Sequence, residues 1–413
     1  MRSTEFQSIE FYYDVVCPYA YLASTQVEAM AQRCGATVQW RPILLGGLLR
    51  EVGAALDPNQ AMSPAKRALL RKERAYWAAL YGVPLREPAE HPRRTVDAMR
   101  LTLAVEDGPT RAALSKALFE AYWVEGRDVS DPAVLADLAV GHGLAADAFE
   151  DPRVRDRLRE STRAAQEAGM FGVPSFVADG RVWWGQDRMP LLERAMGREP
   201  PPLHALRDGP RPTRLTIVHD FASPFSYLAS TQIERIARSR GVTVEWVPIL
   251  LGGLFRSLGT PQVPLLEMNA AKRDYTRRDL DDWAQHWGVP FGFPETFPLR
   301  SVLPLRVALV EPAATPAIYR AIWVEGASVS EPEGLAPVLT AAGLPAASLL
   351  AQAQEIPVKE RLRANTEQAQ AAGVIGVPTF SIERDGRSIL LWGQDRLDMV
   401  AAILDGWCPP NVA

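Results

Sequence analysis

Cysteine and histidine are scarce in this sequence. It contains 3 cysteines and 5 histidines among 413 residues. Cys17, Cys34 and Cys408 stand far apart, with neither a C-x-x-C pair nor a spacing typical of metal ligands. The sequence therefore gives no support to a dithiol redox motif or to metal catalysis. Isolated cysteines are usual in proteins of the reducing cytoplasm, which is the location that we expect.

A strong net charge and a long apolar run are also missing. The formal net charge is −4, and no dense basic stripe is interleaved with aromatic residues, so nucleic acid is a poor candidate partner. No apolar run is long enough to cross a bilayer. Residues 1–6 lack the apolar segment of a signal peptide. We therefore expect neither a nucleic-acid partner nor a membrane partner.

What the sequence does contain is a long internal repeat. The matching motifs are CPYAYLASTQ at 17–26 and SPFSYLASTQ at 223–232, PILLGGL at 42–48 and 248–254, GVP at 172–174 and 376–378, and GQDR at 185–188 and 393–396. A period of about 200 residues is too long for a solenoid and indicates a duplicated domain. We predict one domain at 1–198, a proline-rich linker at 199–212 and a second domain at 213–413.

Each half has the same predicted order of elements. In the first half, residues 9–14 alternate between apolar and polar, Pro18 suits the first turn of a helix, and residues 37–41 indicate a second strand. A βαβ unit favours a parallel strand pair. Helical spacing dominates from about 50 to 168 and from about 255 to 372, after which strand patterns resume. The predicted fold class is α/β, with two tandem thioredoxin-like domains, each βαβ, an all-helical insertion, then ββα.

Cys17 and Ser223 occupy matched positions at the turn between the first strand and the first helix of each half. A side chain at a helix N-terminus faces unpaired N–H groups and the positive end of the helix dipole. A thiolate is stabilised there, whether it belongs to Cys17 or to a bound thiol. A lone Cys-Pro or Ser-Pro more often marks a helix cap or a small buried residue. The matching flanks of the two copies favour the functional interpretation.

The later motifs suggest further ligand contacts. A proline before the third strand of a thioredoxin-like unit is cis and exposes the preceding backbone to a ligand, which the architecture predicts for Pro174 and Pro378. Asp187 and Asp395 either face an ammonium group or cap a helix, with the adjacent arginine on the surface. The remaining candidates are lysines at the start of each insertion, which either pair with a carboxylate or stay solvated. They are Lys66 and Lys272.

Together these blocks resemble the DsbA-like superfamily, and within it the 2-hydroxychromene-2-carboxylate isomerases, which are related to the kappa-class glutathione transferases. SPFSYL at 223–228 is similar to the S-P-[YF]-S-Y-L of that family. The other matching residues are Lys272, Tyr275, Asp279, Leu280, Trp283 and the segment 288–291. The resemblance covers nearly all of both halves. It implies a cytoplasmic enzyme that binds glutathione.

The resemblance also implies roles for individual residues. Ser223 would hydrogen-bond the glutathione thiolate, and the backbone of Val377, before Pro378, would pair with the cysteinyl part. Gln394 and Asp395 would hold the γ-glutamyl end, and the lysine of the insertion, Lys272, would face a carboxylate. The same places in the first half are taken by Cys17, Val173, Pro174, Gln186, Asp187 and Lys66.

Three functions follow as hypotheses. The first is a glutathione-dependent isomerase or transferase acting on a small aromatic carboxylate, with thiolate stabilisation at Ser223. The second is a monothiol, glutathione-linked oxidoreductase acting through Cys17, because Ala20 replaces the resolving cysteine of a C-x-x-C pair. The third is that one half only binds and does not catalyse. The resemblance further suggests that the two halves dock as an internal pseudo-dimer.

Overall fold

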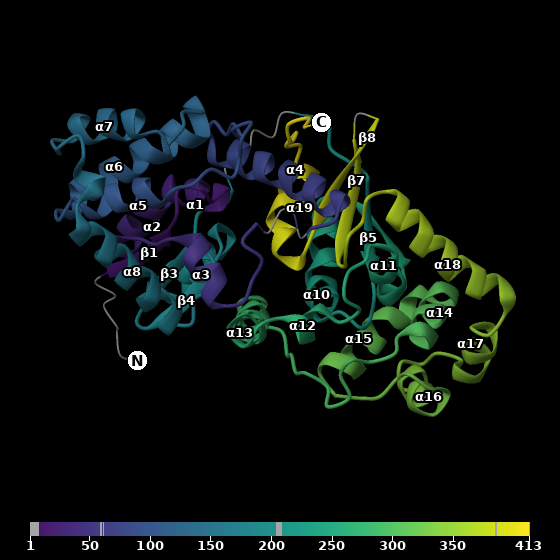
Figure 1. Cartoon of the computed structure of the whole chain (residues 1–413). Helices are drawn as coiled ribbons and strands as arrows, with labels where there is room; N and C mark the ends of the chain where they lie inside the picture. Colours follow the sequence, from purple (N-terminus) through teal and green to yellow (C-terminus); the bar gives the residue numbers. More distant parts are fainter. Residues whose placement is uncertain (1–7, 58–59, 61, 204–208, 385, 413) are drawn as a thin grey trace.

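The computed structural model describes residues 8–57, 60, 62–203, 209–384 and 386–412. Residues 1–6 and part of the predicted linker therefore lie outside the described residues. The two halves are separate bodies joined side by side, each with its own sheet surrounded by helices (Figure 1). Among the helices in the described ranges, none is long and apolar enough to span a bilayer.

A mixed sheet forms the centre of the first half. Its strand order is β2-β1-β3-β4. The strands are β1 (Ser8–Tyr13), β2 (Thr37–Pro42), β3 (Ser175–Ala178) and β4 (Arg181–Trp184). As predicted, β1 and β2 are parallel, whereas β3 is antiparallel to both of its neighbours. The helical region that connects β1 to β2 consists of two segments, α1 (Pro18–Ser24) and α2 (Val27–Cys34).

The second half repeats this topology with the order β6-β5-β7-β8. Its strands are β5 (Arg214–His219), β6 (Thr243–Pro248), β7 (Thr379–Arg384) and β8 (Arg387–Trp392). Again the first two strands are parallel. Here the first helix, α10 (Pro224–Arg238), is continuous.

The insertions are helical in both halves. In the first half they comprise α3 (Leu45–Glu51), α4 (Pro64–Tyr81), α5 (Val96–Leu103), α6 (Gly108–Glu120), η1 (Ala121–Glu125), α7 (Pro132–Gly141), η2 (Ala148–Glu150) and α8 (Pro152–Glu167). In the second half they comprise α11 (Leu251–Ser257), α12 (Pro264–Glu267), α13 (Ala270–Trp287), α14 (Val302–Val310), η4 (Pro312–Ala314), α15 (Thr315–Trp323), α16 (Pro332–Ala341), α17 (Ala346–Gln352) and α18 (Ile356–Ala371). Each half ends in a short turn and a helix, η3 (Gln186–Arg188) with α9 (Met189–Ala195), and η5 (Gln394–Arg396) with α19 (Leu397–Leu404).

A buried tryptophan fastens each insertion to the turn after the first strand. Trp123 and Trp323 are almost completely buried. The indole Nε1 of Trp123 donates to the carbonyl of Val15 at 2.8 Å, and that of Trp323 donates to the carbonyl of Phe221 at 3.0 Å. Because a buried indole N–H needs an acceptor, these bonds fix the insertion close to Cys17 and Ser223.

The long helix at the start of each insertion reaches the other half. Helix α4 lies close to α19, and α13 lies near the first half (Figure 1). The ring of Tyr76 on α4 packs edge-on against Trp407 with centroids 6.3 Å apart. The Tyr275 hydroxyl on α13 accepts a hydrogen bond from the backbone N–H of Trp184 at 2.9 Å. The long insertion helix of each half therefore contacts the other half.

Candidate active site

Cys17 and Ser223 stand at the N-termini of α1 and α10, one residue before a proline. The Ser223 Oγ accepts a hydrogen bond from the backbone N–H of Ser226 and donates one to the carbonyl of Val377, both at 3.2 Å. The Cys17 Sγ donates to the carbonyl of Val173, also at 3.2 Å. Each candidate side chain is thus held against the residue that precedes the matched proline of its own half.

The protonation state of Cys17 differs from the expectation of a stabilised thiolate. Burial raises the pKa of the Cys17 thiol to about 12, although the backbone N–H groups of Ala20 and Tyr19 act in the opposite direction. Only 7% of the residue is exposed. Desolvation of a charged sulfur therefore outweighs the helix terminus, and in this structure Cys17 is a neutral hydrogen-bond donor, like the hydroxyl of Ser223.

The Gly-Val-Pro segments face these side chains. The Val173–Pro174 and Val377–Pro378 peptide bonds are cis. The carbonyl of Pro174 accepts from the N–H of Gly185 at 2.9 Å, and the matching bond joins Pro378 to Gly393 at the same distance. These bonds tie each Gly-Val-Pro segment to the Gly-Gln-Asp-Arg motif after the following hairpin.

The glutamines of the Gly-Gln-Asp-Arg motifs are buried and carry an unused donor. Gln186 and Gln394 are each 2% exposed. Within the described part of the chain, the Nε2 atom of each has no hydrogen-bond partner. The turns that carry them, η3 and η5, contact α1 and α10 respectively. A buried donor without an acceptor is costly, so this matched pair indicates a place for an acceptor group of a ligand, such as a carboxylate.

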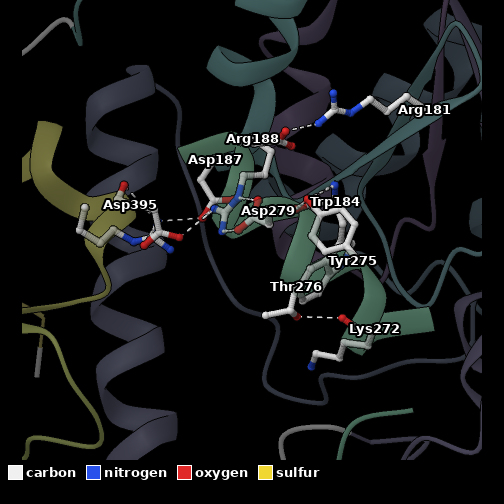
Figure 2. A network of polar contacts seen from close by, with 11 residues as sticks. Arg181, Trp184, Asp187, Arg188, Lys272, Tyr275, Thr276, Asp279 and Asp395 are labelled. Carbon is white, nitrogen blue, oxygen red and sulfur yellow. Dashed lines mark hydrogen bonds and ion pairs between the residues drawn. The ribbon is translucent and has the colours of Figure 1, made fainter. Parts of the chain in front are cut away.

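The aspartates and arginines of the two motifs meet between the halves (Figure 2). Arg188 contacts Asp187 at 3.0 Å and Asp395 of the other half at 2.8 Å. Arg396 contacts the same two carboxylates, Asp187 at 2.8 Å and Asp395 at 3.3 Å. The alternative in which the adjacent arginines lie on the surface is therefore wrong, since their side chains are only 12% and 11% exposed. Burial alone raises the pKa of Asp187, but the arginine charges outweigh it and hold this pKa below the usual value.

The described structure adds two acids that were not among the predicted site residues. Asp279 on α13 accepts two hydrogen bonds from Arg188, at 2.7 and 2.9 Å. Glu73 on α4 accepts one from Arg396 at 2.5 Å. Burial raises the pKa of both carboxyls. Each acid comes from the half opposite to its arginine, so each candidate site includes a group from the other half.

One sequence signal could have found these acids. Glu73 and Asp279 stand at matched positions in the repeat, one turn before the matched tryptophans Trp77 and Trp283. A carboxylate kept at the same place on an otherwise apolar helix face is a candidate for a buried ion pair. The partner could not be inferred, because it lies on the other domain.

The lysines also lie differently from the expectation. Lys66 was assigned to the first half and Lys272 to the second. Instead the Lys66 Nζ lies 5.4 Å from the ring centre of Trp392, and the Lys272 Nζ lies 5.4 Å from that of Trp184. Each lysine therefore stands beside the strand end that leads into the glutamine of the other half. Burial lowers the pKa of both, and the charge of Lys272 adds to the effect on Lys66.

The geometry thus brings most predicted residues together in two similar sites. The first site contains Cys17, Val173, Pro174, Gln186 and Asp187, and it receives Asp279 and Lys272 from the second half. The second site contains Ser223, Val377, Pro378, Gln394 and Asp395, and it receives Glu73 and Lys66 from the first half. The pattern of a helix terminus, a cis proline and a buried amide suits a thiol-containing peptide ligand.

Comparisons with known proteins agree with this architecture. The chain matches the DSBA-like thioredoxin domain over residues 8–197 and 214–405. The 2-hydroxychromene-2-carboxylate isomerase of Pseudomonas putida is 31% identical over 194 residues, which are 46% of this chain and 94% of that protein. Glutathione S-transferase kappa 1 of Rattus norvegicus is 31% identical over 220 residues, covering 48% of this chain and 96% of that protein.

A solved structure of a 2-hydroxychromene-2-carboxylate isomerase is similar at 30% sequence identity, covering 46% of this chain and 95% of that chain, with a TM-score of 0.43. The family-model match over residues 8–197 and 214–405 confirms the resemblance to the DsbA-like superfamily that the motifs indicated. The chain belongs to the DSBA-like thioredoxin domain family, of which it carries two consecutive copies.

Proposed function

We propose that this protein is a glutathione-dependent isomerase or transferase whose turnover centres on Ser223 in the second half. The observation that carries the proposal is the setting of Ser223, at 4% exposure, where its Oγ lies between a helix N–H and the carbonyl before a cis proline. A hydroxyl in this position can turn its proton from the Val377 carbonyl to an incoming thiolate.

The residues present fit glutathione. The unpaired Nε2 of Gln394 suits its γ-glutamyl carboxylate. Four carboxylates, Asp187, Asp395, Asp279 and Glu73, surround two guanidinium groups. If all six were ionised, the cluster would carry two net negative charges. One ligand ammonium group in each site would balance this excess, which is costly in a buried setting.

The protein groups would prepare the thiol for reaction. When bound, glutathione would supply the nucleophilic sulfur for addition to a conjugated aromatic acid or for displacement of a leaving group. Ser223 would donate a hydrogen bond to that sulfur, and the N-terminus of α10 would add its positive potential. Lys66, whose pKa is lowered by burial, would attract a carboxylate of the ligand or the substrate.

Cys17 has the geometry of a hydrogen-bond donor and not that of a redox thiol. Its Sγ donates to Val173 as Ser223 donates to Val377. With a pKa raised to about 12 by burial, very little thiolate is present near neutral pH for attack on a disulfide. The first half therefore fits the same thiol-binding role, which places the monothiol oxidoreductase hypothesis second. A reducing compartment, where free cysteines persist, suits this assignment.

Single-site variants test the proposal. Glutathione affinity is measured by isothermal titration, and turnover by the glutathione-dependent absorbance change of 2-hydroxychromene-2-carboxylate, for S223A, C17A and the double variant. We expect S223A to lower kcat by about tenfold or more, since the lost hydrogen bond goes to a charged sulfur. If S223A kept both its affinity and its kcat, the site would not be at Ser223.

A further inference from the structure

The segment after each long insertion helix forms a wall beside the candidate site. In the second half this wall is aromatic. Phe291, Phe293 and Phe297 surround Trp323, with ring centroids 6.0, 5.6 and 6.3 Å from it. All three phenylalanines are only half-buried. Partly exposed aromatic rings gathered at one place offer stacking faces to a planar ligand, although the Arg277 guanidinium group already lies 5.7 Å from the centre of the Phe293 ring.

This wall is fastened to the turn that carries Ser223. Trp323 donates to the carbonyl of Phe221, two residues before Ser223. Tyr227, in the first turn of α10, donates through its hydroxyl to the carbonyl of Pro290 at 2.5 Å and stacks on Phe291 at 6.2 Å. A substrate that reaches a thiol held at Ser223 therefore meets the aromatic wall.

The matched wall of the first half has polar residues at two of the three positions. The residues at the same positions in the repeat are Leu85, Glu87 and His91. The His91 ring packs against Trp123 with centroids 5.1 Å apart and an angle of 54° between the ring planes, and His91 hydrogen-bonds the Tyr122 hydroxyl at 3.0 Å. Trp123 donates a hydrogen bond to the carbonyl of Val15, two residues before Cys17, which matches the bond of Trp323 in the second half. The two walls thus have the same scaffold and different chemistry.

An arginine completes the polar wall. Arg74 occupies the place of the fully buried Leu280. Its Nη2 lies 2.6 Å from Glu87, and its charge lowers the pKa of the Cys17 thiol, although burial has the larger and opposite effect. The Arg74 side chain is 11% exposed, whereas that of Glu87 is 41% exposed. Because Glu87 is partly solvated, its ion pair with Arg74 contributes little stabilisation. A substrate carboxylate can therefore replace Glu87 as the partner of the buried guanidinium group.

We propose that the two halves differ in the part of the substrate that meets the wall, a flat apolar ring in the second half and a carboxylate in the first. An aromatic acid can still react at Ser223, with its ring against the aromatic wall. This inference rests on the proposed thiol-binding function. Arg74 is the specificity-determining residue of the first half, and Phe293 and Phe297 are those of the second. The Cys17 to Ser223 difference is then one of several exchanges that separate the two sites.

Two aryl chlorides of similar reactivity test this in single-site enzymes. In the reaction the glutathione thiolate forms a C–S bond at the ring carbon that bears chlorine, the C–Cl bond breaks, and chloride leaves with its electron pair. The probes are 1-chloro-2,4-dinitrobenzene, which is neutral, and 4-chloro-3,5-dinitrobenzoate, which is anionic. The S223A variant impairs the site of the second half, so its turnover reports on the first half. The C17A variant impairs the site of the first half, so its turnover reports on the second half.

We expect the ratio of kcat/KM for the anionic probe over the neutral probe to be about tenfold higher in the first half, the worth of one charged hydrogen bond. R74L should abolish this preference, and E87Q should strengthen it by removing the competing carboxylate. In the second half, F293E should lower turnover of the neutral probe. Equal ratios in the two halves, or a ratio unchanged by R74L, would overturn the proposal.

A readout without glutathione separates this inference from the proposed function. Crystals soaked with 4-bromobenzoate or with bromobenzene locate the bromine by its anomalous signal. We expect 4-bromobenzoate beside Arg74 and bromobenzene beside Phe293 and Phe297. If both compounds occupied the same half, the inference would be wrong even if turnover followed the proposed function. If neither half catalysed the reaction but the bromine positions separated, the proposed reaction alone would fail.

Discussion

The charged cluster between the halves gives a sharp test of the composite sites. Arg188→Met removes the guanidinium group that binds Asp279 at 2.7 and 2.9 Å and Asp395 at 2.8 Å, while keeping much of the side-chain bulk. The side chains of Arg188 and Asp279 are only 12% and 6% exposed. Because loss of one partner leaves a buried charge uncompensated, we expect the free energy of unfolding to fall by about 3–5 kcal/mol.

Urea unfolding followed by tryptophan fluorescence measures this loss. The Arg188 guanidinium lies 5.6 Å from the ring centre of Trp283, so one of the 11 tryptophans that give the signal lies beside the cluster. Asp279→Asn added to Arg188→Met should recover at least about 1 kcal/mol, because it removes the orphaned charge. Arg181→Met is the matched control. Arg181 pairs with Asp282 across the same interface, but its side chain is 43% exposed, and we expect a loss below about 1 kcal/mol.

Two outcomes would refute this reasoning. The first is an unfolding free energy for Arg188→Met within about 1 kcal/mol of the parent protein, which would mean that the cluster relaxes or is hydrated. The second is a loss as large for Arg181→Met, which would show that any interface change has this effect. The expected result also includes weaker glutathione binding in both halves, since Arg188 contacts Asp187 and Asp395 alike.

Three further predictions concern single residues. Burial lowers the pKa of His219 from 6.5 to about 3. As the pH falls from 6.5 toward 3, the unfolded chain therefore takes up a proton at His219 before the folded chain does, and the free energy of unfolding decreases. In His219→Gln, the melting temperature measured across this pH range should depend less on pH than in the parent protein. Cys17 should gain no glutathione adduct from oxidised glutathione while the exposed Cys408 reacts, as read by peptide mass spectrometry. Gln394→Ala should weaken glutathione binding in calorimetry by about tenfold, and unchanged affinity would remove Gln394 from the site.

Much of the fold could be predicted because it depends on local patterns. The alternation in residues 9–14 and the helical spacing of the insertions identified the elements, and the βαβ order gave the parallel pair. One detail could not be predicted. Residues 21–26 and 227–232 have the same sequence, yet the helix is interrupted at Thr25 in the first half and is continuous in the second. The identical segment cannot decide between the two, so the difference comes from the unlike residues on either side of it or from the packing around it.

The site was predictable within a half and not between halves. The positions of Cys17 and Ser223 and the segments before Pro174 and Pro378 follow from strand and helix order. The pKa of Cys17 does not, because the sequence shows the helix terminus but not the burial that outweighs it. The family resemblance places each lysine in the site of its own half, because it matches residues by their position along the chain. Helices α4 and α13 instead carry their side chains to the other domain.

The tandem arrangement explains how two such sites can diverge and still depend on each other. In a symmetric dimer of identical chains, every substitution enters both sites at once. In a fused chain, a substitution enters one wall alone, as the difference between Arg74 and the matched Leu280 or between Glu87 and the matched Phe293 illustrates. The aspartates and arginines of the Gly-Gln-Asp-Arg motifs have no such freedom, because Asp187 and Asp395 each contact both arginines. Divergence is therefore expected in the walls, and identity in the Gly-Gln-Asp-Arg motifs, which is the pattern that the two halves display.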